Sequence, residues 1–206
     1  LPNIEINVLE VSPAEAIDLL YARQLNVAVV AADSIAASNV SFSSKDIFTD
    51  PYVLAVPKKI DLDNITSFKD LKQEDKEIIS STILFEFGSL YKKRIDEWLK
   101  NTLPDLKPIA HTRSYEVALS MVEAGLGVVI LPALTSVVGL NKFYDVKLYK
   151  TNLLNRRLVA LTPNQFSNTE PSKSFISSLI EAGMSLTLPP MLDMPKFFSY
   201  TTDSKK

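Results

Sequence analysis

The sequence contains no cysteine, and this absence excludes disulfide bridges and thiolate chemistry. It contains one histidine, His111, so the chain offers neither a recognisable zinc site nor a Ser-His-Asp arrangement. Only five glycines are present, and none of them forms G-x-G-x-x-G, G-x-x-x-x-G-K-[ST] or G-x-S-x-G. We therefore expect no metal and no cofactor, and we favour binding over catalysis.

Long apolar runs are also missing, because no stretch approaches the roughly 20 residues that a membrane helix needs. The first residues, LPNIEINVLE, lack the basic and then apolar regions of a secretory signal. The net charge of −2 and the pI near 5.5 argue against a broad nucleic-acid surface, which needs clustered Lys and Arg. We expect a cytoplasmic protein with no membrane partner, and any DNA contact has to come from outside this sequence.

What the sequence does contain is an alternation of strand and helix patterns, which predicts an α/β fold. Its 206 residues, 46% of them hydrophobic, suffice for one large domain or two small lobes with cores of their own. The predicted strands are residues 4–9, 26–31, 52–56, 81–87, 107–111, 128–131, 146–148 and 157–161, and the predicted helices are residues 13–24, 89–100, 114–124 and 174–182, the last of these stopped at Gly183.

The most informative stretch is HTRSYEVALSMVEAGLGVVILPA, which begins at His111. Ser114 is placed to cap a helix that has apolar residues on one face, and Gly125 and Gly127 are placed to end it. The run VVIL then predicts a buried strand, which Pro132 closes. This helix, turn and strand unit gathers its polar groups at one end, as a binding site requires.

The same residues carry a family resemblance. The pattern S-x-E-x-A-L-x-x-V-x-A-G-L-G-V-x-x-L-P, from Ser114 to Pro132, resembles the effector-domain signature of LysR-type transcriptional regulators. Further segments resemble this family in the same order, and the resemblance runs from Leu1 to about Gly183. These segments are LPNIEINVLEVSPAEAIDLL, LNVAVV, DIFTDPYVLAVPKK, SFKDLKQEDKEII and IDEWLKNTLPDLKPIAHTRS.

The resemblance implies two Rossmann-like lobes joined by two crossover strands, as in type 2 periplasmic binding proteins, with the ligand between the lobes. We expect the crossings near Pro57 and Leu161. Lobe one would then comprise residues 1–58 plus 162–206, and lobe two residues 59–161.

Compared with that family, the sequence lacks a helix-turn-helix, a linker helix, and the first strand and first helix of lobe one. We interpret the chain as part of a longer parent that contacts DNA through the missing N-terminal domain. The resemblance implies a homodimer or homotetramer for that parent.

Three helix starts could bind an anion or a polar small molecule, because backbone N–H groups and the helix dipole favour negative charge there. The resemblance implies that such helix starts face the ligand. With a neighbouring aromatic residue and the proline that closes the signature, the candidate effector-binding residues are Ser12, Pro13, Phe87, Gly88, Ser89, Ser114, Tyr115 and Pro132.

Each candidate also has a structural interpretation. Ser12, followed by Pro13 and by Glu15, is an ordinary capping pattern, and Phe87 on a strand is more often a core residue. Arg113 could meet an acidic effector or form a surface ion pair. We expect His111 to have a structural role.

Three functions remain open. The first is a ligand-sensing effector domain of a LysR-type DNA-binding regulator that binds a small polar or anionic metabolite between two lobes. The alternative is a solute-binding protein of a membrane transporter, and the third is an enzyme, for which no ionisable constellation can be named. The residues after Met184 have no functional interpretation: they form a loose tail, or their apolar residues pack on lobe one or on a neighbour.

Overall fold

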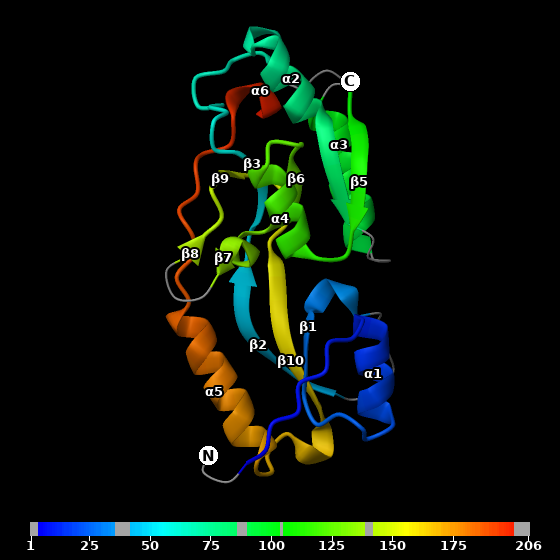
Figure 1. Ribbon diagram of the computed structural model, residues 1–206. Helices are drawn as coiled ribbons and strands as arrows, with labels where there is room; N and C mark the ends of the chain where they lie inside the picture. Colours follow the sequence, from blue (N-terminus) through cyan, green and yellow to red (C-terminus); the bar gives the residue numbers. More distant parts are fainter. Residues whose placement is uncertain (1–3, 36–41, 86–89, 104, 139–141, 200–206) are drawn as a thin grey trace. The chain divides into compact units, whose positions relative to one another are not determined.

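Strands and helices alternate along the chain and assemble into two α/β units, each with its own sheet and hydrophobic core (Figure 1). The computed structural model describes residues 4–35, 42–85, 90–103, 105–138 and 142–199. Unit 1 comprises Leu1–Asp50 and Arg156–Thr187, and unit 2 comprises Pro51–Asn155 and Leu188–Lys206. The α/β architecture predicted from the sequence is confirmed.

Unit 1 is built on an antiparallel sheet with the strand order β1-β10-β2. Its elements are α1 Pro13–Tyr21, β1 Ala28–Ala31, β2 Phe42–Asp50, β10 Arg156–Pro163 and α5 Ser172–Ser185, with short 3-10 helices at Ala32–Ser34 and Asn164–Phe166. Helix α1 buries Ala16 and Leu20 in one cluster with β1 and β10, and α5 buries Ile176 in a second cluster with β2 and β10. The two helices therefore serve separate parts of one small core.

The strand predicted at residues 4–9 is wrong. These residues adopt no regular structure and are exposed, Ile6 to 60% and Val8 to 83%. Alternation of apolar and polar residues favours a strand only where a neighbouring strand supplies backbone hydrogen-bond partners. Among the described residues no strand of unit 1 pairs with this segment, since the sheet of unit 1 joins β1, β10 and β2.

Gly183 does not stop helix α5, which continues to Ser185. The residue is buried where α5 approaches β2, and a Cβ atom at this position would lie against the backbone carbonyl of Ile47, closer than real Cβ atoms approach. Glycine is therefore required here by close packing of a helix on a strand, not by a turn.

Substitution Gly183→Ala should destabilise unit 1. Alanine gains about 1 kcal/mol of helix propensity over glycine, but the clash with the Ile47 backbone should cost about 1 to 3 kcal/mol more than that gain. Urea unfolding measures the difference. The matched control, Glu181→Ala on the exposed side of the same helix, should leave the free energy of unfolding nearly unchanged; a Gly183→Ala variant more stable than the parent would contradict the prediction.

Unit 2 contains a larger mixed sheet. Strands β6-β3-β9 pair antiparallel, and strands β4 and β5 pair parallel. Val128, just before β6, joins β4 to β6: the N–H of Ile83 donates to the carbonyl of Val128 (2.9 Å), and the N–H of Val128 donates to the carbonyl of Ser81 (2.8 Å). The strand order is therefore β5-β4-β6-β3-β9. The elements are β3 Tyr52–Pro57, α2 Gln73–Ser80, β4 Ser81–Phe85, α3 Leu90–Thr102, β5 Lys107–Thr112, α4 Tyr115–Glu123, β6 Val129–Pro132, β7 Val137–Val138, β8 Lys142–Phe143, β9 Val146–Lys150 and α6 Lys196–Ser199, with 3-10 helices at Phe68–Asp70 and Ala133–Ser136.

The helix, turn and strand unit predicted from Ser114 onward is confirmed. Helix α4 begins after Ser114 and ends at Glu123, and Gly125 takes the left-handed conformation with φ of 78°. The N–H of Leu126 donates to the carbonyl of Met121 (3.1 Å), which completes a Schellman turn. All four residues of β6 are buried, as the continuous apolar run indicates.

A buried tyrosine fastens the edge of unit 2. Tyr149 on β9 is fully buried, and its Oη accepts a hydrogen bond from the N–H of Leu62 (2.9 Å). Burial is the main cause that raises the pKa of Tyr149 to about 12, and the nearby carboxylates of Asp63 and Asp61 raise it further. The folded state therefore holds this phenol in its neutral form.

This shift predicts a loss of stability at alkaline pH. Because the folded pKa lies above the unfolded value of 10.0, the contribution is complete below pH 10 and is lost as the pH rises through about 12. Relative to Tyr149→Phe, the parent should lose about 1 kcal/mol between pH 9 and pH 11. Urea titrations at both pH values test this, and parallel curves for parent and variant would contradict it.

The boundaries between the units differ from those predicted at residues 58 and 162. Strand β3 lies between β6 and β9 in the sheet of unit 2, and β10 lies between β1 and β2 in the sheet of unit 1. The chain therefore crosses at Asp50/Pro51 and at Asn155/Arg156, ahead of the predicted crossings near Pro57 and Leu161. Each predicted crossing strand is instead a central strand of one unit.

The assignment of the tail to lobe one is also wrong. The described part of the tail, residues 188–199, belongs to unit 2 (Figure 1, orange to red). Phe197 and Phe198 are buried in the cluster that contains Trp98 and Tyr149, and Leu192 pairs with Tyr149 of β9. Two buried phenylalanines contribute roughly 3 to 6 kcal/mol of burial free energy, which holds the segment against unit 2.

Candidate functional site

The polar candidates in unit 2 gather at one edge of its sheet. Strands β4 and β5 run parallel, and the bridge from Thr82 to Val128 shows that the chain entering β6 runs parallel to them as well. Their carboxyl ends, at Phe85, Thr112 and Pro132, therefore lie at the same edge. In α/β proteins this is the edge where ligands bind, because the loops and helix starts that follow the strands meet there.

At the start of α4, neighbouring residues of this edge form hydrogen bonds with one another. Ser114 Oγ accepts a hydrogen bond from the N–H of Val117 (3.2 Å) and donates one to Glu116 Oε2 (2.6 Å). Thr112 Oγ1 accepts the N–H of Ser114 (3.1 Å). The capping role predicted for Ser114 is confirmed, and the hydroxyl already uses its one proton.

Glu116 places a negative charge beside this cap. The hydrogen bond from Ser114 is the main cause that lowers the pKa of the Glu116 carboxyl, and the glutamate's own backbone N–H lowers it further. Its side chain is exposed, and so is that of Arg113 on the preceding loop. The edge therefore presents the Glu116 carboxylate and the Arg113 guanidinium to solvent. Arg113 directly follows β5, and Glu116 is the second residue of α4.

Two half-buried rings form the apolar part of the edge. Phe85, the last residue of β4, and Tyr115, the first residue of α4, have ring centroids 4.4 Å apart with their planes tilted by 44°. Phe85 is thus an aromatic residue that the described structure brings to Tyr115. Phe87, Gly88 and Ser89 lie outside the described residues, and their role remains a prediction.

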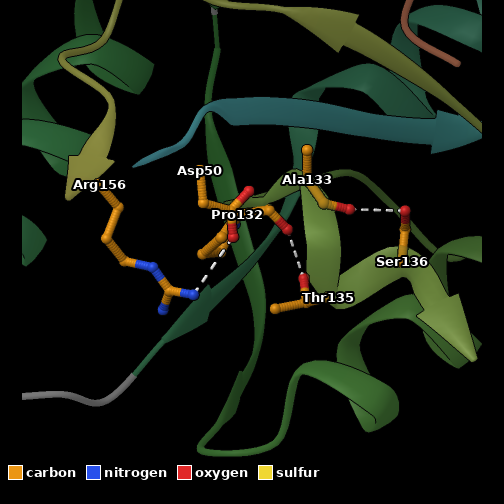
Figure 2. A network of polar contacts seen from close by, with 6 residues as sticks. All are labelled: Asp50, Pro132, Ala133, Thr135, Ser136 and Arg156. Atoms are coloured by element: carbon orange, nitrogen blue, oxygen red, sulfur yellow. Dashed lines mark hydrogen bonds and ion pairs between the residues drawn. The ribbon is translucent and has the colours of Figure 1, made fainter. Parts of the chain in front are cut away.

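The hydroxyl groups of the 3-10 helix that follows β6 donate hydrogen bonds to nearby backbone carbonyls. Thr135 Oγ1 donates to the carbonyl of Pro132 (2.6 Å), and Ser136 Oγ donates to the carbonyl of Ala133 (2.7 Å), as Figure 2 shows. Pro132 and Ser136 are buried, whereas Thr135 is half-buried. Pro132 therefore contributes its backbone carbonyl to this edge. Of the two hydroxyl groups, that of Thr135 belongs to the more exposed residue.

The two remaining candidates belong to unit 1. Ser12 Oγ accepts the N–H of Glu15 (3.2 Å), and Pro13 occupies the first turn of α1. The capping interpretation is confirmed for Ser12. Whether Ser12 and Pro13 also contact an effector remains a prediction.

An ion pair that sequence reasoning missed lies where the chain leaves unit 1. Asp50, the last residue of β2, is fully buried, and its Oδ2 lies 3.3 Å from Nη2 of Arg156, the first residue of β10 (Figure 2). Arg156 Nε is buried, and no hydrogen-bond partner for it is found among the described residues. The pair joins residues 106 positions apart in the sequence, so no local pattern marks it.

Removing the carboxylate of this pair should be costly. Asp50→Ala leaves the Arg156 guanidinium largely buried without its counter-charge, which should lower the free energy of unfolding by about 3 to 5 kcal/mol. The matched control is Asp46→Ala, because Asp46 pairs at 3.3 Å with Arg157 on the same two strands but in solvent. That exposed pair should contribute at most about 1 kcal/mol. Equal effects of the two substitutions in urea unfolding would contradict the prediction.

No group of three or more His, Cys, Asp or Glu side chains in the described part of the chain is arranged to hold a metal ion. His111 is exposed at the end of β5. No helix among the described residues is long and apolar enough to cross a membrane.

Residues 1–183 match the family described as the LysR substrate binding domain. No curated protein matches the sequence significantly. The matched range covers both units and ends inside α5, so the tail lies beyond it.

Solved structures share the fold at low sequence identity. The regulatory domain of Synechocystis CcmR in complex with 2-PG is 12% identical with a TM-score of 0.66, and the alignment covers 90% of this chain and 86% of that one. The effector binding domain of QuiR in complex with shikimate is 17% identical with a TM-score of 0.57, covering 86% and 80%. HinK, a LysR family transcriptional regulator from Pseudomonas aeruginosa, is 14% identical with a TM-score of 0.62; 87% of this chain is covered, but only 61% of HinK.

Proposed function

The chain belongs to the LysR substrate binding domain family, and we propose that it senses a small-molecule effector for a LysR-type transcription regulator. Family membership supports sensing, and the bound 2-PG and shikimate of two structural relatives support a small polar ligand. The alternative, a solute-binding protein of a transporter, gains no support from this family. We propose binding without turnover.

The observation that carries the proposed site is the convergence of β4, β5 and the end of β6 on the start of α4. The effector would lie against the Phe85 and Tyr115 rings, with hydroxyl groups of Ser114 and Thr135 within the same edge. Ser12, Pro13 and residues 87–89 are proposed as further contacts. Such an edge suits a ligand with a small apolar body and a few polar groups.

The charges at this edge favour an anionic group on the ligand. Arg113 is exposed and precedes the α4 start, whose dipole also attracts negative charge. The Glu116 carboxylate repels an anionic ligand as long as it accepts the hydrogen bond from the Ser114 hydroxyl and so stays beside the helix start. We therefore propose that binding turns Glu116 away, so that Ser114 donates to the ligand instead.

Signal transmission would follow from differential affinity. A ligand that prefers one arrangement of the regulator shifts the population toward it and thereby changes binding at a second site. DNA would be that second ligand, bound by a part of the regulator other than this chain, whose net charge is −2. We propose that the whole regulator is a cytoplasmic homodimer or homotetramer.

A thermal-shift screen of small carboxylates and phosphate esters tests the proposal. A ligand present at 100 times its dissociation constant should stabilise the protein by about 2.7 kcal/mol, and mass spectrometry should recover it unchanged. Glycine is also a favourable N-cap residue, so Ser114→Gly removes the hydroxyl at little cost in helix stability. Loss of the hydroxyl should weaken ligand binding by up to about tenfold.

The matched control is Ser67→Gly, because Ser67 caps the 3-10 helix at Phe68–Asp70 in the same unit, outside the proposed site. This substitution should leave affinity unchanged. The proposal fails if no compound in the screen stabilises the chain, or if both glycine variants bind a stabilising compound as tightly as the parent.

A further inference from the structure

Beyond α5 the chain leaves unit 1 and adds to the sheet of unit 2. The N–H of Leu192 donates to the carbonyl of Leu148 (2.8 Å), and the N–H of Lys150 donates to the carbonyl of Leu192 (2.9 Å). Asp193 pairs with the side chain of Lys150 (2.8 Å). We call residues 186–198 the strap. The family match ends before it, at residue 183.

The far end of the strap is anchored on aromatic residues. Phe197 and Phe198 are 6% and 4% exposed. The Phe198 ring meets Trp98 of α3 edge-on, with centroids 5.5 Å apart, and the Phe197 ring lies 6.3 Å from that of Phe68. The strap is therefore docked by backbone pairing at one point and by buried rings at another.

Trp98 connects the strap to the segment that precedes the second crossing of the chain. Its indole Nε1 donates to Asn152 Oδ1 (2.5 Å), and Asn152 lies between β9 and the start of unit 1 at Arg156. The Trp98 side chain thus contacts the strap through its ring and, through its N–H, the segment of unit 2 that precedes the second crossing. Displacement of Phe198 would expose Trp98 and would weaken the contacts of Trp98 with both segments.

The free length of the strap is short. Six residues separate Ser185, the end of α5, from Leu192, which allows at most about 24 Å at full extension. Leu186 and Leu188 are exposed, whereas Pro189 is buried, and the Pro189–Pro190 pair restricts the backbone further. Whatever arrangement the two units adopt, these six residues set an upper limit on the distance between the end of α5 and the docking point at Leu192.

We propose that the strap is a third covalent connection that couples movement of unit 1 against unit 2 to the docking of Phe197 and Phe198. A change in the separation of the units has to be absorbed by about six residues, or it pulls on the Leu192 pairing and the aromatic anchor. The strap thereby limits the range of motion open to the two units. This inference does not depend on the identity of the effector.

The test lengthens the strap without undocking it. An insertion of about ten Gly and Ser residues between Thr187 and Leu188 adds roughly 17 Å of root-mean-square reach. Because the chain has no cysteine, Asp18→Cys on α1 and Ser120→Cys on α4, both exposed, supply unique sites for spin labels in the two units. The distribution of label distances should broaden, while Trp98 fluorescence, from the chain's single tryptophan, should stay unchanged.

The matched control places the same insertion between Asn168 and Thr169, in an exposed loop inside unit 1. It should leave the label distances unchanged. A second variant, Phe198→Ala, should shift Trp98 emission to longer wavelength and broaden the distances as the strap insertion does. Identical distributions for parent and strap insertion, or equal broadening by the control insertion, would overturn the proposal.

Discussion

The burial of strand β3 is the constraint on which the rest of the structure depends. Residues 53–56 are fully buried, and the two faces of the strand belong to the two core clusters of unit 2. One residue, Pro51, separates the strand from Asp50, which is itself fully buried at the end of β2. The chain therefore changes from one core to the other at Pro51, where proline removes a hydrogen-bond donor and fixes φ.

Polar contacts hold this crossing on both of its sides. Within unit 1, Asp50 pairs with Arg156. Within unit 2, Thr151 Oγ1 donates to the carbonyl of Tyr52 (2.7 Å), and the N–H of Ala133 donates to the carbonyl of Pro51 (2.8 Å). The first two crossings are thus tied together by residues that flank them, and the free backbone is confined to a few positions between these ties.

The same strand positions the proposed site and the strap. On one side β3 pairs with β6, which fixes the position of Pro132 at the edge where Phe85, Thr112 and Tyr115 meet. On its other side β3 pairs with β9, which in turn pairs with Leu192 of the strap. The proposed site and the docking point of the strap therefore lie on one continuous hydrogen-bonded sheet.

The sequence by itself determined the local units: the caps at Ser12 and Ser114, the helix and strand that follow Ser114, and the family. Capping bonds join residues three apart, and apolar periodicity reports burial on a single element, so both can be read along the chain. Only the tertiary structure decided that residues 4–9 form no strand, that Asp50 meets Arg156, and where Phe198 packs. Those outcomes depend on partners distant in sequence, because a strand needs a neighbour, a buried charge needs a counter-charge, and an apolar tail packs on whichever core has room for its rings.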